Sequence, residues 1–336
     1  MSEVLIHVTR GNVVENLHRG DIAIVDSNGS LIGAKGDHQK YTFMRSCAKP
    51  LQASAVLESG AASHYQLEDK EIAIMCASHY AENFHTQAVE SILNKVGLKE
   101  ENLILGETYS MNTAVMQCMI KDGLQRRKLY NNCSGKHAGM LALAIHKGYD
   151  IADYIGENHP VQQLMLRAVS EYCEYDADKI AIGVDGCGVP VFALPIYNMA
   201  LSYAKLADRS KRSNERRVAA DAIIKAMTKY PEMIAGTGGF CSELMKHTKG
   251  RILAKLGADA VYCISLLDRK IGIAVKIENG NVDVLSCAVM EALIQLQALT
   301  EEEIDLLKGF HTKENINSAK CKVGEIRPVF QLDKIM

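Results

Sequence analysis

Ser46 and Lys49 lie three residues apart in a segment with the features of a helix start. Small and apolar residues follow from Leu51 to Ser59, and Pro50 suits a first turn, where its missing N–H costs little. On one helical face, the hydroxyl and the amine would be neighbours. A lysine kept away from water can lose its proton near neutral pH and accept the proton of a serine that attacks a carbonyl. The segment predicts a nucleophile and its base; the simpler interpretation is a helix N-cap with a solvated lysine.

A second serine and a second lysine, Ser78 and Lys255, are expected in loops at strand ends. Ser78 follows the apolar run Ile72–Ala77, which we interpret as a short buried strand, and Lys255 comes shortly before another strand. Taken singly, the two residues fit an N-cap serine and a surface lysine. An early Ser-x-x-Lys followed by a late Lys-x-Gly, however, is the order of signals in serine β-lactamases and penicillin-binding proteins.

Cys133 and Cys187 lie in glycine-containing loops between polar residues, where a thiolate could meet a metal or a substrate. Lys136, His137 and Asp185 are within a few residues of them, and such donors suit zinc. No CxxC pair is present, so turn or packing roles remain an alternative. The cysteines predicted to be small core residues are Cys76, Cys118, Cys173, Cys263 and Cys287.

The composition is that of a folded chain with a large core, since 48% of its 336 residues are hydrophobic. The formal net charge of -2 gives no reason to expect a nucleic acid or an anionic membrane as partner. The N-terminus lacks a secretory pattern and no apolar run reaches the roughly 20 residues that span a bilayer. We therefore expect a cytoplasmic protein with reduced thiols. The nearest basic cluster, interpreted as a solvated helix face, contains Arg209, Lys211, Arg212, Arg216 and Arg217.

The elements that must position these residues follow from hydrophobic periodicity and turn signals. We expect strands within residues 1–35 and at Lys179–Val184, Val261–Leu267, Ile271–Ile277 and Val282–Leu285. We expect helices at Ser46–Ser59, Asn83–Val96, Ala138–His146, Pro160–Tyr175, Tyr197–Ala207, Asn214–Tyr230 and Cys287–Leu299. Residues after Gly309 are weakly patterned. These elements favour an α+β fold in one catalytic unit of residues 1–336, with an antiparallel sheet from residues 1–35 and 260–285 and a helical region at about 46–250.

Five motifs in this order resemble the zinc-associated L-asparaginase II family, and the resemblance runs from about Val4 to Leu299. The motifs are Arg45–Gln52, Ala77–His79 with Glu82 and His85, Asn132–Met140, Gly183–Pro190 and Lys255–Ala258. This asparaginase class is similar in fold to serine β-lactamases and glutaminases, and it is distinct from the threonine-dependent bacterial asparaginases. The resemblance therefore implies a sheet with helices packed around it and an amide substrate.

The resemblance also implies roles for individual residues. Ser46 with Lys49 and Ser78 with Lys255 resemble the two Ser-Lys pairs of the family, with Ser46 as nucleophile and the second pair as proton shuttle. The implied zinc ligands are Cys133, Lys136 and Cys187, and the implied substrate contacts are Arg45, His137 and Asp185.

The implied reaction is hydrolysis of L-asparagine to L-aspartate and ammonia through an enzyme ester, in a homodimer. Glutamine or a cyclic amide such as a β-lactam is an alternative substrate, and a zinc-binding sensor or scaffold with inert Ser-Lys pairs is a non-catalytic alternative. Three positions depart from the family pattern and bear on substrate affinity: Ala81, Gly239 and Asp259–Ala260 stand where glycine, arginine and Glu-Gly are expected.

Overall fold

The computed structural model describes residues 1–208, 210 and 213–335, which form two compact units. The sheet unit contains Met1–Cys47, Leu194–Asp208 and Glu243–Met336, and the helical unit contains Ala48–Ala193 and Arg209–Ser242. Arg209, Lys211 and Arg212 of the predicted basic cluster lie outside the described residues. Within the described residues, none of the helices has the length and apolar character needed to cross a bilayer.

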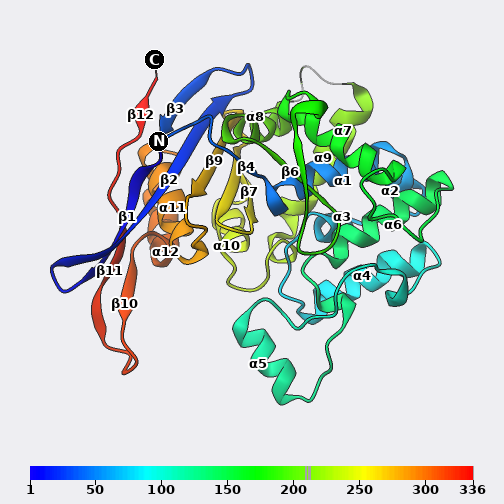
Figure 1. The fold of residues 1–336 in the computed structure, drawn as a ribbon, viewed down its shortest axis with the longest axis horizontal. Coiled ribbons are helices and arrows are strands. Elements are labelled where there is room, and N and C mark those ends of the chain that lie inside the picture. Colours follow the sequence, from blue (N-terminus) through cyan, green and yellow to red (C-terminus); the bar gives the residue numbers. More distant parts are fainter. Residues whose placement is uncertain (209, 211–212, 336) are drawn as a thin grey trace. The chain divides into compact units, whose positions relative to one another are not determined.

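The sheet unit is built on an antiparallel sheet in the strand order β10-β11-β1-β2-β9-β8-β7, with β3 paired to β2 and β12. The blue and red strands of the two chain ends pair with each other, as Figure 1 shows for β1 and β11. The strands are β1 (Glu3–Arg10), β2 (Val13–Asp26), β3 (Leu31–Lys35), β7 (Ile252–Gly257), β8 (Val261–Leu266), β9 (Ile271–Ile277), β10 (Lys313–Ile316), β11 (Lys322–Pro328) and β12 (Asp333–Lys334). The predicted α+β class, with sheet strands from both ends of the chain, is confirmed.

Helices cover both faces of this sheet, because residues 272–277 of β9 are all buried although their side chains alternate between faces. At Gly272 the backbone of α8 comes so close that a Cβ atom would lie 1.8 Å from Ala200 O. Helix α11 packs on β1, β8, β9 and β11. The helices here are α8 (Ile196–Ala207), α11 (Leu285–Gln295) and α12 (Glu301–His311), and the residues of α10 (Phe240–His247) are divided between the two units.

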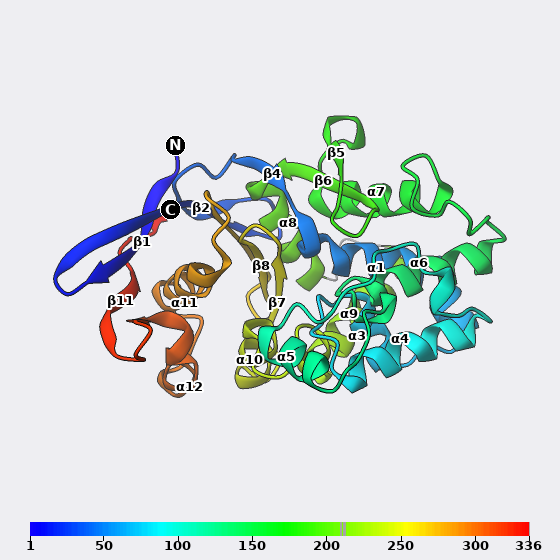
Figure 2. The ribbon, with the colours of Figure 1, turned by 60° about the horizontal axis from the view of Figure 1, so that its bottom comes forward.

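The helical unit packs α1 against α6, α7 and α9, and packs α3 against α6 and α9 (Figure 2). Its one hairpin joins β5 (Ala181–Val184) to β6 (Pro190–Pro195) among the described residues. The helices are α1 (Lys49–Glu58), α2 (Ala61–His64), α3 (Asp69–Met75), α4 (Asn83–Lys95), α5 (Thr113–Lys121), α6 (Ser134–Lys147), α7 (Pro160–Cys173) and α9 (Asn214–Lys229). The predicted helices in this region are confirmed within a few residues, although α6 begins four residues earlier than expected.

Two predicted strands are wrong. The run Ile72–Ala77 lies mostly in α3, because Glu68 and Glu71 form a capping box that starts a helix and its apolar face packs on α6 and α9. Residues 282–285 form a short 3₁₀ turn, Val282–Val284, that leads directly into α11. The cysteine prediction also fails once, since Cys118 is exposed on α5 rather than part of the core.

Candidate functional site

Lys49 is the first residue of α1 and follows a short 3₁₀ helix, Arg45–Ala48, that contains Ser46. The N-cap of α1 is Ala48, and no side chain caps this end. Only 1% of Lys49 is exposed. The simpler interpretation of this motif, an N-cap serine and a solvated lysine, is therefore wrong on both counts.

The Lys49 amine has three hydrogen-bond partners inside the helical unit. Nζ lies 2.5 Å from Ala77 O, 3.1 Å from Ser78 Oγ and 3.1 Å from Asn132 O. An ammonium would donate to all three oxygens, whereas a neutral amine would donate to the two carbonyls and accept from the Ser78 hydroxyl. The same geometry thus suits Lys49 with or without its extra proton, and it brings Lys49 together with Ser78.

Backbone bonds and buried histidines hold the segment around Ser78. Ser78 N donates to Ile234 O over 2.9 Å. His79 Nδ1 accepts from Ala81 N, and its Nε2 lies 2.9 Å from Ser134 Oγ. Burial lowers the pKa of His79 well below its usual value and that of His85 to about 4. Both rings are therefore neutral at neutral pH and serve as scaffold.

Lys255 lies in the sheet unit, inside the edge strand β7 rather than in a loop before a strand. It has no exposed surface, and its Nζ donates to Leu256 O over 2.6 Å. The interpretation of Lys255 as a surface lysine is wrong. In the same unit, Cys47 Sγ lies 3.1 Å from Lys255 O, so the segment that carries Ser46 runs beside β7.

The predicted metal ligands meet in the helical unit. Ligand atoms of Cys133, Asp185 and Cys187 all lie within 4.8 Å of one another. Lys136 Nζ is 3.1 Å from Cys187 Sγ and 3.8 Å from Asp185 Oδ2. Asp185, predicted both as a donor near the two cysteines and as a substrate contact, therefore lies in the donor cluster.

Two glycines explain why the chain can bring these donors together. At Gly135, in the first turn of α6, a Cβ atom would lie 2.2 Å from Ile74 O, so glycine lets α6 approach α3 closely. Gly188 has a φ of +95° in the turn between β5 and β6, where Asp185 N also bonds to Val189 O. The turn that carries Asp185 and Cys187 is therefore closed by its own backbone bonds.

The charged and titratable groups of the cluster shift one another's pKa values. The hydrogen bond between the two thiols lowers the pKa of Cys187 to about 5 and raises that of Cys133 to about 12, with burial adding to the rise. Burial by itself would lower the pKa of Lys136, but the nearby Cys187, Cys133 and Asp185 charges raise it overall. These shifts favour a Cys187 thiolate beside the Lys136 ammonium, whose Nζ lies 3.1 Å from Cys187 Sγ.

This donor set fits zinc. Two sulfur atoms, a carboxylate and an amine that can lose its proton to a metal are donors that zinc accepts, and all four side chains are buried or nearly so. His137 lies next to Lys136 in α6; its Nε2 is buried and has no partner among the described residues. Burial, reinforced by the Lys136 charge, lowers the pKa of His137 to about 3, so the ring is neutral, and its tautomer decides whether Nε2 donates or accepts.

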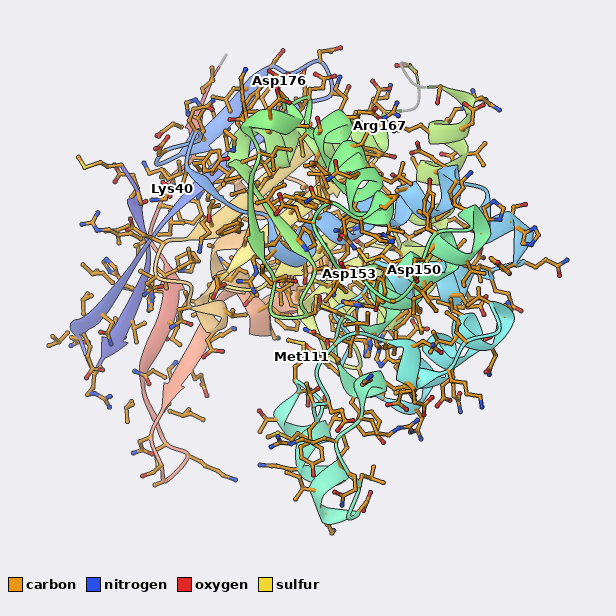
Figure 3. All side chains as sticks on the ribbon, turned by 45° about the vertical axis from the view of Figure 1, so that its right-hand side comes forward. Lys40, Met111, Asp150, Asp153, Arg167 and Asp176 are labelled. Atoms are coloured by element: carbon orange, nitrogen blue, oxygen red, sulfur yellow. The ribbon has the colours of Figure 1, made fainter. Side chains whose placement is uncertain are left out.

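Tyr154 is a neighbour of this cluster that the sequence did not reveal. Its hydroxyl lies 2.7 Å from His137 Nδ1 and accepts from Ile104 N. The tyrosine lies in the loop between α6 and α7 that also carries Asp150 and Asp153, both labelled in Figure 3. Because the Tyr154 contact fixes one ring nitrogen of His137, it also fixes the direction in which the other nitrogen points.

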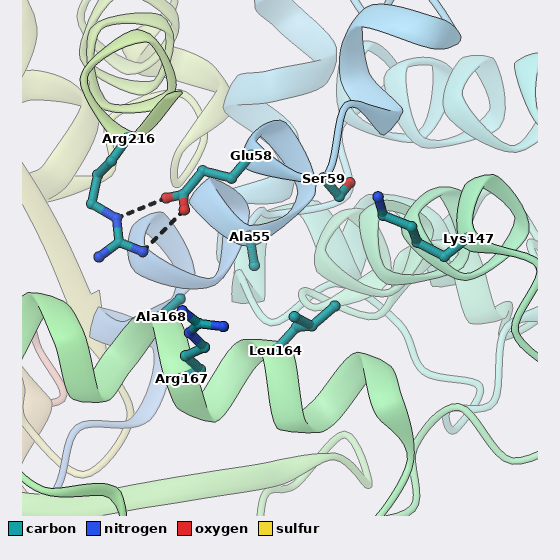
Figure 4. Close-up of a pocket in the computed structure, with 8 residues that line it drawn as sticks. All are labelled: Ala55, Glu58, Ser59, Lys147, Leu164, Arg167, Ala168 and Arg216. Carbon is teal, nitrogen blue, oxygen red and sulfur yellow. Dashed lines mark hydrogen bonds and ion pairs between the residues drawn. The ribbon is translucent and has the colours of Figure 1, made fainter. Parts of the chain in front are cut away.

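A separate pocket of about 300 Å³ is bounded by α1, α6, α7 and α9, as Figure 4 shows. Arg216 closes one side through two hydrogen bonds of 3.0 Å to Glu58, and Arg167 and Lys147 face the opening. The pocket contains none of the predicted site residues. The chemistry-bearing residues of this unit are instead buried around Lys49 and Cys187.

A family model described as L-asparaginase II matches residues 6–328. The chain belongs to the L-asparaginase II family. Membership of this family assigns the chain to the amidohydrolases and gives a small molecule as the substrate. No curated protein matches the sequence.

Two solved structures are similar to the chain. A protein from Bacteroides dorei DSM 17855, provisionally described as a β-lactamase, has 9% identity and a TM-score of 0.43, with 81% of this chain and 92% of that chain covered. A β-lactamase from Mycobacterium bovis has 13% identity and a TM-score of 0.42, with 83% and 95% covered.

Proposed function

We propose that the protein hydrolyses the side-chain amide of L-asparagine to L-aspartate and ammonia through an ester on Ser46. The observation that carries this proposal is the buried Lys49 amine, 3.1 Å from the Ser78 hydroxyl, in a chain of the L-asparaginase II family. A buried amine in contact with a hydroxyl can exchange a proton with it directly, without solvent.

In the first half of the reaction, Ser46 Oγ attacks the amide carbon and neutral Lys49 accepts the serine proton. Backbone N–H groups near the start of α1 stabilise the negative oxygen that forms. The C–N bond then breaks, and the amine leaves as ammonia after it receives a proton. Ser78 relays that proton, since its Oγ touches Lys49 Nζ.

In the second half, water attacks the ester carbonyl and gives up a proton by the same route through Ser78. The bond between the acyl carbon and Ser46 Oγ then breaks. Ser46 regains its proton and aspartate leaves. Lys255 completes the second predicted Ser-Lys pair, and Arg45, His137 and Asp185 are the proposed substrate contacts.

Zinc is the proposed cofactor, held by Cys133, Lys136 and Cys187 with Asp185 beside them. When bound there it supplies a localised positive charge that attracts an electron-rich group of the substrate. The residues themselves orient that charge, since the turn of Asp185 and Cys187 and the first turn of α6 are held by close backbone packing.

Turnover measurements test the proposed substrate. We expect ammonia release from L-asparagine to exceed release from L-glutamine, and nitrocefin to remain intact. Mass spectrometry of enzyme quenched during turnover should reveal an aspartyl adduct on the peptide that contains Ser46. Faster turnover of glutamine or nitrocefin would make that compound the proposed substrate in place of asparagine. Absence of turnover with all three compounds would favour a non-catalytic zinc protein.

Removal of one thiol tests the metal site. We expect protein purified without chelator to contain stoichiometric zinc by elemental analysis, and the variant Cys187→Ser to lose most of it, because the serine hydroxyl is a poor zinc ligand at neutral pH. Cys118→Ser, which changes an exposed cysteine on α5, is the matched control and should keep its zinc. Wild-type protein without zinc would contradict the proposed site.

Three further parts of this proposal are a homodimer, which the family resemblance implies, a cytoplasmic location, which the lack of a secretory pattern indicates, and one catalytic unit of residues 1–336, which the order of elements favours. They stay predictions, and the oligomeric state can be measured by light scattering.

A further inference from the structure

The residues on either side of Ser46 are both attached to the β7–β8 hairpin, within the sheet unit. On one side, the guanidinium of Arg45 pairs with the carboxylate of Asp259 in the turn of the hairpin. On the other side, Cys47 Sγ donates to Lys255 O on β7 over 3.1 Å. The backbone of Ser46 is therefore held from two directions against the strand that carries Lys255.

Close packing and a buried tyrosine strengthen this attachment. At Gly257, the last residue of β7, a Cβ atom would lie 2.4 Å from Val261 Cγ1 and 3.0 Å from Met44 O, so glycine favours the close approach of the hairpin to the segment before Ser46. The hydroxyl of Tyr203, buried on α8, donates to Cys47 O over 2.9 Å. The position of Ser46 thus depends on the position of the hairpin turn.

The turn itself has an unfavourable backbone. Asp259 and Ala260 both have a φ of +56°, and Arg45 has a φ of +49°, although none of them is glycine. Such conformations persist only where surrounding contacts enforce them. The ion pair of Arg45 and Asp259 is too exposed to do this by itself, since 67% of the Asp259 side chain is accessible.

Lys276 on β9 supplies the missing support. Only 7% of this lysine is exposed, and its Nζ donates to Asp259 O and, over 2.8 Å, to Ile277 O. The charged groups nearest to it are Asp21, Lys40, Arg45 and Asp259. A buried lysine is costly, and nothing in the proposed reaction uses this one. Its bonds to backbone carbonyls point to a structural task at the turn.

We propose that Lys276 is a positioning residue for Ser46: it fixes the Asp259 turn, the turn fixes Arg45, and Arg45 sets the nucleophile against β7 and Lys255. This inference rests on the proposed role of Ser46 as nucleophile. It differs from the prediction that Arg45 binds substrate, because here Arg45 acts through its pair with Asp259. A small displacement of a nucleophile can cost about 100-fold in rate, so such support has a measurable effect.

The test compares Lys276→Met with Lys276→Arg, which keeps the charge and the donors. We expect Lys276→Met to lower kcat for asparagine about tenfold or more with KM changed less than about twofold, and Lys276→Arg to recover most of the loss. Lys270→Met is the matched control, because Lys270 stands at the other end of β9 and pairs with Asp208 instead. It should keep wild-type kinetics.

A second readout does not depend on the substrate. The rate at which a fluorophosphonate labels Ser46, followed by mass spectrometry, should fall in Lys276→Met in parallel with kcat. If the protein turned over no asparagine, the proposed function would fail while this labelling rate still tested the positioning role. Unchanged labelling and unchanged kcat in Lys276→Met would overturn the inference, as would a rise in KM alone.

Asp259→Asn covers the case in which Lys276→Met does not fold, because its exposed carboxylate can change without disturbing the core. The positioning role predicts a lower kcat and slower labelling, with recovery in Asp259→Glu. If Arg45 instead binds the substrate carboxylate, releasing it from Asp259 should lower KM and leave kcat unchanged, and that result would also overturn the inference.

Discussion

Ser46→Ala should lower ammonia release from asparagine by about 1,000-fold or more, since an enzyme that loses its nucleophile keeps only the catalysis supplied by binding and oxyanion stabilisation. The substitution removes one oxygen from a partly buried position, and the neighbours Arg45 and Cys47 keep their contacts with the hairpin. We therefore expect a normal melting temperature together with the loss of activity. A coupled assay for ammonia and a thermal scan measure the two effects.

The matched control is Ser54→Ala, which removes a buried hydroxyl from the same helical segment, where Ser54 Oγ donates to Leu51 O. It should retain activity. The quenched-turnover adduct gives a second check, because it must disappear in Ser46→Ala. An adduct that persisted in Ser46→Ala and mapped to Ser78 would identify Ser78, which contacts Lys49, as the nucleophile. Wild-type turnover without any adduct would contradict a mechanism through a serine ester.

Local sequence patterns predicted most of the helices and strands. They failed where the same pattern fits either a buried strand or a buried helix. Residues 271–277 have the length and β-branched content of a buried strand, and they form one. Ile72–Ala77 is equally apolar, but six apolar residues suit a buried strand or one side of a buried helix. Here the capping box of Glu68 and Glu71 and the contacts with α6 and α9 decide for the helix.

The weakly patterned tail was a further failure. Strands β10 and β11 are mostly half-exposed or exposed, so burial imposes little alternation on their sequence, yet β11 pairs with β1 and β10 pairs with β11 at that edge of the sheet. Strands at a sheet edge are held largely by backbone hydrogen bonds, and these do not depend on the type of side chain.

For the site, too, the sequence indicated which residues take part but not which of them are in contact. The sequence identified Lys49, Ser78, Cys133 and Cys187 as chemically informative, and the structure buries all four. It did not predict that Lys49 contacts Ser78, because the two residues are 29 positions apart and meet only through tertiary packing. The spacing rule linked Lys49 to Ser46 instead, and that rule assumes one continuous α-helix, whereas the chain changes from a 3₁₀ helix to an α-helix between them.

Lys49→Met should abolish turnover, with a loss of about 1,000-fold or more, because the site then lacks the amine that contacts Ser78 over 3.1 Å. Methionine fills a similar volume in this buried position. The carbonyls of Ala77 and Asn132 lose a donor, so we expect a modest fall in melting temperature.

Lys49→Arg separates the two roles that an amine can have. Arginine keeps a positive charge near Ala77 O and Ser78, but a guanidinium does not lose its proton at any accessible pH and cannot act as a base. If Lys49 accepts a proton, this variant should be as inactive as Lys49→Met. Lys147→Met, which changes an exposed lysine at the end of α6, should stay fully active. Retention of more than about a tenth of the activity in Lys49→Arg would mean that Lys49 contributes charge alone, and the base in the proposed reaction would have to be another group.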